Sequence, residues 1–213
     1  VYDLFTHEFR AARKEEYVNM TCGYDYKEAD PKKVENVIEF MEEMFPKKKD
    51  TKEFLIILSR SLEGINYEEI GVFCIGGGGN GKGLLFGDCL KGALGDYYAT
   101  LDGSYFTEHK TDTRNPALYS TRKARLLNVT EPQKQKKVLT DIFKAATGRD
   151  EIMVRTNYQK KDTAMVFPPL FFQSNHYIQL ESDTEGNSVK RRLRGVSFPH
   201  TFVPDKEYKR MKK

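Results

Sequence analysis

The chain has 213 residues, enough for one or two domains that bury a core without disulfide support. Leu, Ile, Val and Phe together account for 51 of the 213 residues, about 24%, which lies above the roughly 20% below which highly charged chains stay unfolded. The longest apolar run, Phe54 to Leu58, is far too short to cross a bilayer. Composition therefore argues against a disordered chain and against a membrane partner.

The net charge of +4 is unevenly distributed along the chain. Residues 1–53 carry 10 Lys and Arg against 13 Asp and Glu, whereas residues 54–213 carry 25 against 18. The stretch 186–213 alone has 9 basic residues against 2 acidic ones. This basic segment favours a polyanionic partner, and a solvated charged tail is the alternative.

Cysteine usage and the N-terminus bear on the compartment. The three cysteines are odd in number and show no C-x-x-C spacing, which argues against a disulfide framework or a structural zinc site. The pattern favours a reducing, intracellular compartment, and no secretory signal begins the chain. Because the chain begins at Val1, we expect it to be a piece of a longer protein.

Two amphipathic helices are predicted in the first part of the chain. The first begins at Asp30 and Pro31 and stops at Pro46, with apolar residues at helical spacing: Val34, Val37, Ile38, Met41 and Phe45. The second runs from about 51 to 62, with one apolar face formed by Phe54, Leu55, Leu58 and Leu62. We interpret residues 1–53 as a small helical lead-in or collar segment.

Strands and helices alternate after the second helix. The predicted helices cover 82–94 and 138–146, each closed by a glycine. The runs 152–155 and 164–167 flank a polar tip and predict a hairpin. The other predicted strands are 72–75, 126–129, 170–173 and 195–198. This order predicts an α/β fold with a central, mostly parallel sheet flanked by helices over residues 54–204, followed by a basic C-terminal end at 205–213.

A phosphate-binding loop is predicted between the first strand and the helix that follows it. The segment fits G-x-x-x-x-G-K in its sequence Gly76, Gly77, Gly78, Gly79, Asn80, Gly81 and Lys82. Glycines let backbone N–H groups turn toward phosphate oxygens, and Lys82 would bridge the outer phosphates. The motif normally continues with Ser or Thr, which ligates Mg²⁺, but Gly83 stands there. A glycine-rich turn without chemical function is the alternative.

Polar residues follow two other predicted strands, at the end where ligands bind in open α/β sheets. Glu131 is the candidate acid that would hold Mg²⁺ and orient water, and an ordinary capping glutamate before Pro132 is the alternative. Asn175 could hydrogen-bond the terminal phosphate or the attacking water, although asparagine is also common where strands end in turns.

Two arginines, Arg191 and Arg192, precede the last predicted strand. An arginine inserted into a neighbour's phosphate site can raise the hydrolysis rate by about 10³ to 10⁵. A basic run that binds phosphate backbones, or is merely solvated, is the alternative.

The order of these motifs resembles that of the superfamily three helicases, in particular the poxvirus-type and phage-plasmid primase-helicases. The phosphate loop centred on Asn80-Gly81-Lys82 looks like the family's first motif. Residues Ala124–Pro132 look like the family's second motif, and Phe172–Asn175 look like its third. The family's intermediate motif is matched by Lys144, Thr147-Gly148, Asp150 and Arg155. Its arginine-finger segment is matched by Asp183, Arg191-Arg192-Leu193 and Phe198. Two flanking elements are matched by Gly95-Asp96-Tyr97 and Asn115-Pro116.

The resemblance implies an AAA+-like P-loop ATPase module that binds ATP and Mg²⁺ at the interfaces of a homo-oligomeric ring, usually a hexamer. It implies that the ring encircles single-stranded DNA at a fork, and that a primase domain precedes the module in the full-length protein. The hairpin that carries Lys160 and Lys161 would project into the pore, where paired lysines suit backbone contact. Two solvated turn lysines are the alternative. The implied location is a viral replication site inside the host cell.

The leading hypothesis is therefore an ATP-dependent DNA helicase module. Lys82 binds phosphates, Glu131 organises Mg²⁺ and water, Asn175 senses the terminal phosphate, and Arg192, with Arg191 second, completes a neighbour's site. A second hypothesis, favoured by Gly83, is a DNA-gripping ring that binds nucleotide but hydrolyses it weakly or not at all. A third, a P-loop kinase for small molecules, leaves the arginine segment without a role.

Overall fold

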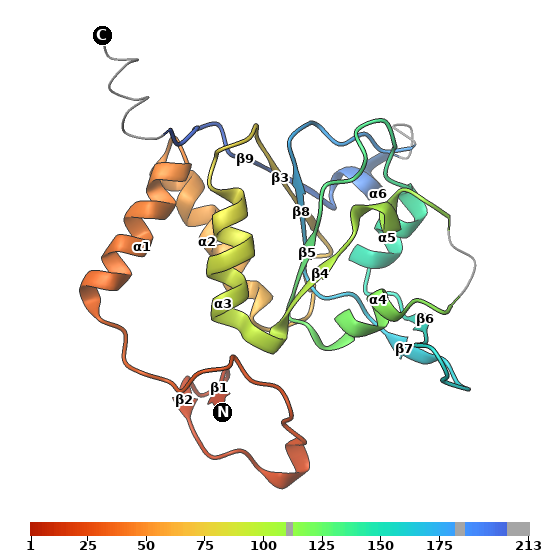
Figure 1. The fold of residues 1–213 in the computed structure, drawn as a ribbon, viewed down its shortest axis with the longest axis horizontal. Coiled ribbons are helices and arrows are strands. Elements are labelled where there is room, and N and C mark those ends of the chain that lie inside the picture. Colours follow the sequence, from red (N-terminus) through yellow and green to blue (C-terminus); the bar gives the residue numbers. More distant parts are fainter. Residues whose placement is uncertain (110–112, 182–185, 204–213) are drawn as a thin grey trace.

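A five-stranded parallel sheet lies between two layers of helices in the computed structural model, which describes residues 1–109, 113–181 and 186–203 (Figure 1). The strand order is β4-β5-β8-β3-β9. The strands are β3 (Gly71–Ile75), β4 (Tyr98–Leu101), β5 (Leu126–Val129), β8 (Leu170–Ser174) and β9 (Leu193–Ser197). The predicted α/β class with a parallel central sheet is confirmed. The edge strand β4 was not predicted, because it contains no continuous apolar run.

Side chains that alternate along each strand separate the core into two clusters. Phe171 faces the layer formed by α1 (Pro31–Met44), α2 (Lys48–Ser61), η2 (Leu84–Leu90) and α3 (Lys91–Leu94). Its neighbour Phe172 faces the layer that contains α4 (Pro116–Ser120), α5 (Thr140–Thr147) and α6 (Gly186–Lys190). Both rings are fully buried, and each contributes about 1.5–3 kcal/mol by leaving water. The continuous apolar run in β8 is therefore explained, because helices cover both faces of this strand.

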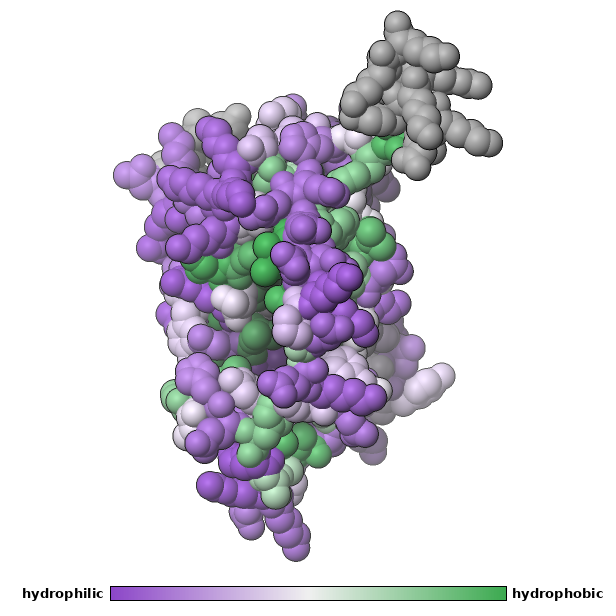
Figure 2. All heavy atoms as spheres, turned by 90° about the vertical axis from the view of Figure 1, so that its left-hand side faces the viewer, coloured by the Kyte–Doolittle hydropathy of each residue, from purple (hydrophilic) through white to green (hydrophobic). Residues whose placement is uncertain are grey.

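The first helix, α1, forms as predicted but buries only the C-terminal half of its apolar face. Asp30 accepts a hydrogen bond from the amide of Lys32, and Pro31 occupies the first turn. Met41 and Met44 are buried, but three apolar residues nearer the start of the helix are 43–60% exposed: Val34, Val37 and Ile38. Figure 2 shows apolar side chains among the charged ones on this side of the molecule.

The helix expected at 82–94 is divided. Residues 84–90 form the π-helix η2, and only α3 at 91–94 has α-helical geometry. Glycines at 83, 87 and 92 lower the helix propensity of this segment, and π-helical turns are frequent at functional sites. The wider turn thus lies directly after the predicted phosphate loop.

The remaining segments are short. The hairpin expected at 152–167 is confirmed as antiparallel strands β6 (Ile152–Val154) and β7 (Thr163–Met165). A second small hairpin joins β1 (Tyr2–Asp3) and β2 (Glu8–Phe9), and the 3₁₀ turns are η1 (Lys14–Glu16), η3 (Gly95–Tyr97), η4 (Gly103–Phe106) and η5 (Thr121–Lys123).

The N-terminal segment and the sheet domain are continuous in structure. The boundary expected between residues 53 and 54 falls inside α2, whose Phe54 packs in the core cluster that contains Phe171 and Phe198. The basic end at 205–213 lies outside the described residues, as does Asp183.

Candidate functional site

The carboxyl edge of the sheet brings together the three candidate residues that follow strands. Lys82 ends the loop after β3, Glu131 comes two residues after β5, and Asn175 comes directly after β8. Because all five strands run in parallel, these ends meet at one edge. They line one pocket of about 180 Å³, formed by Lys82, Thr130, Glu131, Gln173, Ser174 and Asn175.

Glycines are required in the loop after β3 for two separate reasons. Gly79 and Gly81 have φ angles of 71° and 83°, a region in which a Cβ is strained. Gly76 has an ordinary φ, but a Cβ there would lie 2.3 Å from the carbonyl oxygen of Phe198. The loop is also held from within, since the buried Asn80 side chain donates to the carbonyl oxygen of Gly77. The sequence therefore encodes one tightly folded loop.

A segment that follows β9 lies against this loop. The amide of Phe202 donates to the carbonyl oxygen of Gly79 at 2.7 Å, and the Asn80 side chain donates to that of Phe198 at 3.4 Å. His200 contacts the carbonyl oxygen of Glu43 in α1 at 2.7 Å. The loop is thus supported by the end of the described chain and by the first helix.

Lys82 directs its ammonium group into the loop. Its Nζ donates to the carbonyl oxygen of Gly76 at 2.6 Å, and the residue is 5% exposed. Burial lowers the pKa of this lysine, while the carboxylate of Glu131 acts in the opposite direction. An anion that enters the pocket would stabilise the charged form of Lys82, because burial has removed water from its ammonium group.

Glu131 is held by three donors at the pocket. The backbone amide and the side-chain amide of Asn175 each donate to one of its carboxylate oxygens, both at 2.9 Å. His176 places Nε2 2.9 Å from the first of these oxygens. Behind this group, Gln173 donates to Asn128 at 2.7 Å and ties β8 to β5. Sequence reasoning missed His176, whose only signal is that it follows Asn175.

Gly83 leaves room for a side chain. It has helical φ and ψ angles of −58° and −44°, and among the described residues no neighbouring heavy atom lies within 4 Å of a Cβ built on it. Within the described ranges, no cluster of three or more His, Cys, Asp or Glu residues could hold a metal ion. Glu131 is the acidic oxygen donor of the pocket, and carboxylate oxygen suits Mg²⁺.

Arg191 and Arg192 lie at the opposite edge of the sheet. The carbonyl oxygen of Arg192 accepts from the amide of Gly71, the first residue of β3, at 2.8 Å. Five residues of β3 separate this edge from the predicted phosphate loop, a distance of about 16 Å at about 3.3 Å per residue. The structure therefore does not bring either arginine to the loop of its own chain. Both contact Glu69, each at 3.1 Å, and the side chains of Arg191 and Arg192 are 64% and 12% exposed.

The β6–β7 hairpin presents Lys160 and Lys161 on the surface, at the lower right in Figure 1. Tyr158 next to them is fully exposed and adopts a φ of 67°. The turn is braced by a hydrogen bond from Gln159 to the hydroxyl of Tyr119 at 3.1 Å. The sequence reasoning missed Tyr158, although an aromatic residue beside paired lysines is a pattern of single-strand binders.

No helix among the described residues is long and apolar enough to cross a bilayer.

Comparisons with known proteins agree with the motif order. A family model described as "Family of unknown function (DUF5906)" matches residues 74–192. The chain is 30% identical over its whole length to "Putative helicase L207/L206" of Acanthamoeba polyphaga mimivirus, of which it covers 22%. It is 27% identical over 80% of its length to "Putative helicase 121R" of Invertebrate iridescent virus 3, of which it covers 19%. The chain thus spans about a fifth of the length of these relatives.

Solved structures share the fold. Apo structures of the NrS-1 C-terminal region superpose on 89% of this chain with TM-scores of 0.56 and 0.61, at 16% and 15% identity, and 44% and 45% of those chains are covered. The resemblance to viral helicases is confirmed by the two relatives, and the solved structures show that the fold is shared.

Proposed function

This chain belongs to the family described as DUF5906, and we propose that it is the ATP-hydrolysing module of a viral or mobile-element DNA helicase. The observation that carries the proposal is the convergence of Lys82, Glu131 and Asn175 on one pocket beside a glycine loop. An acid, a neutral amide and a buried lysine beside backbone N–H groups are the parts that phosphoryl transfer to water needs.

Each residue has a role that follows from its position. Lys82 exchanges its bond to the Gly76 carbonyl for phosphate oxygens, since a charge-assisted bond to phosphate is stronger than one to a neutral carbonyl. Glu131 orients the attacking water and would hold Mg²⁺, which when bound neutralises charge on the phosphates. Asn175 contacts both the phosphate pocket and Glu131, so a change at the terminal phosphate reaches the acid through it.

The arginines act on a neighbouring subunit. Arg191 and Arg192 lie an entire strand length from their own phosphate loop, so their guanidinium groups do not serve that site and are available to a neighbouring subunit. Arg191, as the more exposed of the two, makes the contact, and the largely buried Arg192 supports it. This order reverses the one expected from the sequence. A contact of this kind between subunits is head-to-tail, and the ring that the family resemblance implies, usually a hexamer, would close it.

The β6–β7 hairpin provides the DNA contact. Lys160 and Lys161 suit the phosphates of a single strand, and the exposed ring of Tyr158 suits stacking on a base. The hairpin would move along single-stranded DNA at a fork as ATP is hydrolysed. In the full-length protein, a primase domain would precede this module, and the site of action would be the replication site of a virus in its host cell.

A second function is favoured by one observation. Gly83 offers no hydroxyl where the motif normally supplies a Mg²⁺ ligand, and a ring that binds nucleotide without hydrolysing it would tolerate that loss.

Phosphate release in the presence of Mg²⁺ and single-stranded DNA separates the two functions. Wild-type protein should hydrolyse ATP, and Lys82→Ala should lower turnover at least 100-fold because both the loop charge and the phosphate contact are lost. Lys91→Ala, an exposed lysine on α3, serves as the matched control and should retain turnover. No release from wild type, with DNA binding intact, would support the non-hydrolysing ring instead.

A further inference from the structure

We propose that Glu69 is a positioning residue that gathers three arginines into the group a neighbouring subunit's nucleotide meets. Glu69 lies at the amino-terminal edge of the sheet, opposite the phosphate loop. One carboxylate oxygen lies 3.1 Å from both Arg191 and Arg192, and the other lies 3.7 Å from Arg149. The inference rests on the proposed function and adds Glu69 and Arg149 to it.

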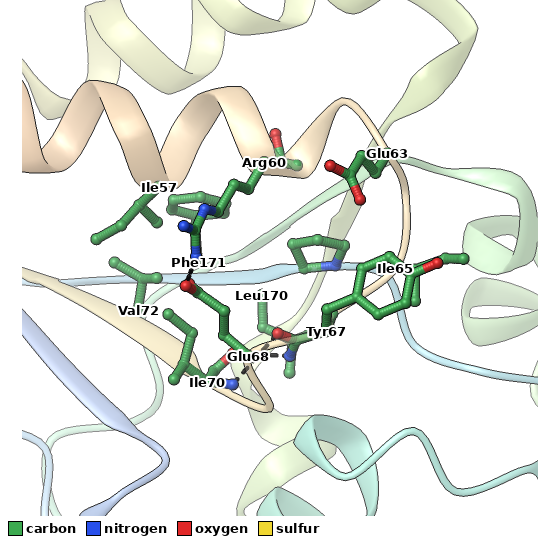
Figure 3. Close-up of a pocket in the computed structure, with 13 residues that line it drawn as sticks. Ile57, Arg60, Glu63, Ile65, Tyr67, Glu68, Ile70, Val72, Leu170 and Phe171 are labelled. Atoms are coloured by element: carbon green, nitrogen blue, oxygen red, sulfur yellow. Dashed lines mark hydrogen bonds and ion pairs between the residues drawn. The ribbon is translucent and has the colours of Figure 1, made fainter. Parts of the chain in front are cut away.

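The turn that carries Glu69 holds it in a strained conformation. Glu69 has a φ of 54°, which non-glycine residues rarely adopt. The buried Asn66 imposes this turn by donating to the carbonyl oxygen of Ile70 at 2.8 Å and accepting from its amide at 3.2 Å. On the other side, Glu68 pairs with Arg60 of α2, as Figure 3 shows. Both flanks of Glu69 are therefore anchored, and strain of this kind concentrates at functional sites.

Glu69 also explains how three guanidinium groups can share one location. Arg149 has a φ of 64° and places its guanidinium 5.9 Å from the ring of Tyr67. Without a carboxylate between them, the three positive charges repel. With Glu69 present the group keeps a net charge of +2, because three cations surround one anion. The group thus stays attractive to a triphosphate while its members are held together.

The exposure of the three arginines divides their tasks. Arg192 is 12% exposed, and its buried Nε has no hydrogen-bond partner within the described part of the chain, so it forms the base of the group. Arg149 and Arg191 are 44% and 64% exposed and face outward. We assign the contact with the neighbour's phosphates to these two, because their guanidinium groups reach solvent and can form paired hydrogen bonds to phosphate oxygens.

Strand β3 connects the group, at one end of the strand, to the phosphate loop at its other end. Arg192 accepts from Gly71 at the start of β3, and β3 pairs with β9 over five residues before the loop begins. If the arginines shift when they contact a neighbour's nucleotide, β3 and β9 connect that shift to the loop that holds the nucleotide of their own subunit.

Two substitutions separate positioning from a structural role. Glu69→Gln keeps the shape of the side chain but removes its charge, whereas Glu69→Gly also relieves the positive φ. Glu53→Gln is the matched control, since Glu53 pairs with Lys49 within α2, outside the arginine group and the turn that carries Glu69. If Glu69 were only structural, Glu69→Gly would be tolerated best. As a positioning residue, both Glu69 variants should lower kcat at least tenfold, with KM for ATP and the melting temperature little changed.

Phosphate release should be measured for wild type, Lys82→Ala, both Glu69 variants, and a mixture of Glu69→Gly with Lys82→Ala. The mixture should recover turnover, because interfaces form in which one subunit supplies an intact loop and its neighbour supplies intact arginines. Full activity of Glu69→Gly, or a mixture no more active than its components, would overturn the inference. Failure of the proposed function is recognised separately, because wild type would then be inactive or insensitive to Lys82→Ala, and the inference would fall with it.

Discussion

Introducing a hydroxyl at position 83 tests the place where the predicted phosphate loop departs from the usual motif. Gly83 has helical backbone angles, and an added Cβ would have no neighbouring heavy atom of the described ranges within 4 Å, so Gly83→Ser and Gly83→Ala both fit without displacement. Each replaces glycine near the start of a helix and should stabilise the fold by about 0.5–1 kcal/mol. For a chain of this size, the melting temperature should rise by about 1–4 °C in both variants.

Only the serine variant should change metal dependence. A hydroxyl bonded to a charged group contributes about 1.5–3 kcal/mol, equivalent to roughly 10- to 100-fold in affinity. Gly83→Ser should lower the Mg²⁺ concentration for half-maximal phosphate release by about that factor, whereas Gly83→Ala should match wild type. A Mg²⁺ titration of turnover measures both variants. Equal Mg²⁺ dependence in Gly83→Ser and Gly83→Ala would refute the assignment of position 83 to the metal site.

Three further predictions concern the loop and the hairpin. Gly76→Ala should lose about 1–3 kcal/mol of stability through a backbone clash, whereas Gly77→Ala, with open space around its Cβ, should be neutral or slightly stabilising; equal urea midpoints would contradict this. Because burial lowers the pKa of Lys82 in the folded chain, the unfolded chain binds more protons there between that pKa and 10.5, and wild-type stability gains as pH rises through this window. The melting temperature of Lys82→Met relative to wild type should therefore fall as pH is raised toward 10.5, and a constant difference would count against the burial effect. Replacing Lys160 and Lys161 together by alanine should weaken single-stranded DNA binding and reduce its salt dependence by about one to two counterions, while an unchanged slope in a salt titration would remove the hairpin from the interface.

The loop, the acid and the amide could be placed from sequence because the fold obeys a simple rule. Residues that directly follow parallel strands share one edge, so the linear positions of Lys82, Glu131 and Asn175 are enough to predict that they converge. Glu131 and Asn175 lie within two residues of their strands, which leaves little freedom for another outcome, and the motif of the glycine loop places Lys82. The run of glycines likewise predicts a tight loop, and Gly79 and Gly81 do adopt the positive φ that only glycine tolerates readily.

Contacts made across long stretches of chain could not be predicted in this way. Glu69 is separated by 122 residues from Arg191, and nothing in its local sequence distinguishes it from Glu68 beside it. Its role depends on the turn that Asn66 fixes and on the pairing of β3 with β9. His176 is similar, because its contact with Glu131 requires the register of β8 beside β5.

Position in the sheet also decided what the arginine motif can do. The sequence places Arg191 and Arg192 before a strand, but only the strand order shows that they lie a full strand length from their own loop. Burial then distinguishes the two, which sequence cannot do because both are adjacent and identical. The exposed side chain is that of Arg191.

The central claim, that Glu131 drives hydrolysis in the pocket that Lys82 and Asn175 share, is tested most directly by Glu131→Gln. The amide keeps the size of the side chain but loses the charge that organises water and Mg²⁺. DNA-stimulated phosphate release should fall by about 100-fold or more, while the affinity for ATP measured by equilibrium binding stays within a few-fold of wild type. Turnover by Glu131→Gln at the wild-type rate would contradict the account.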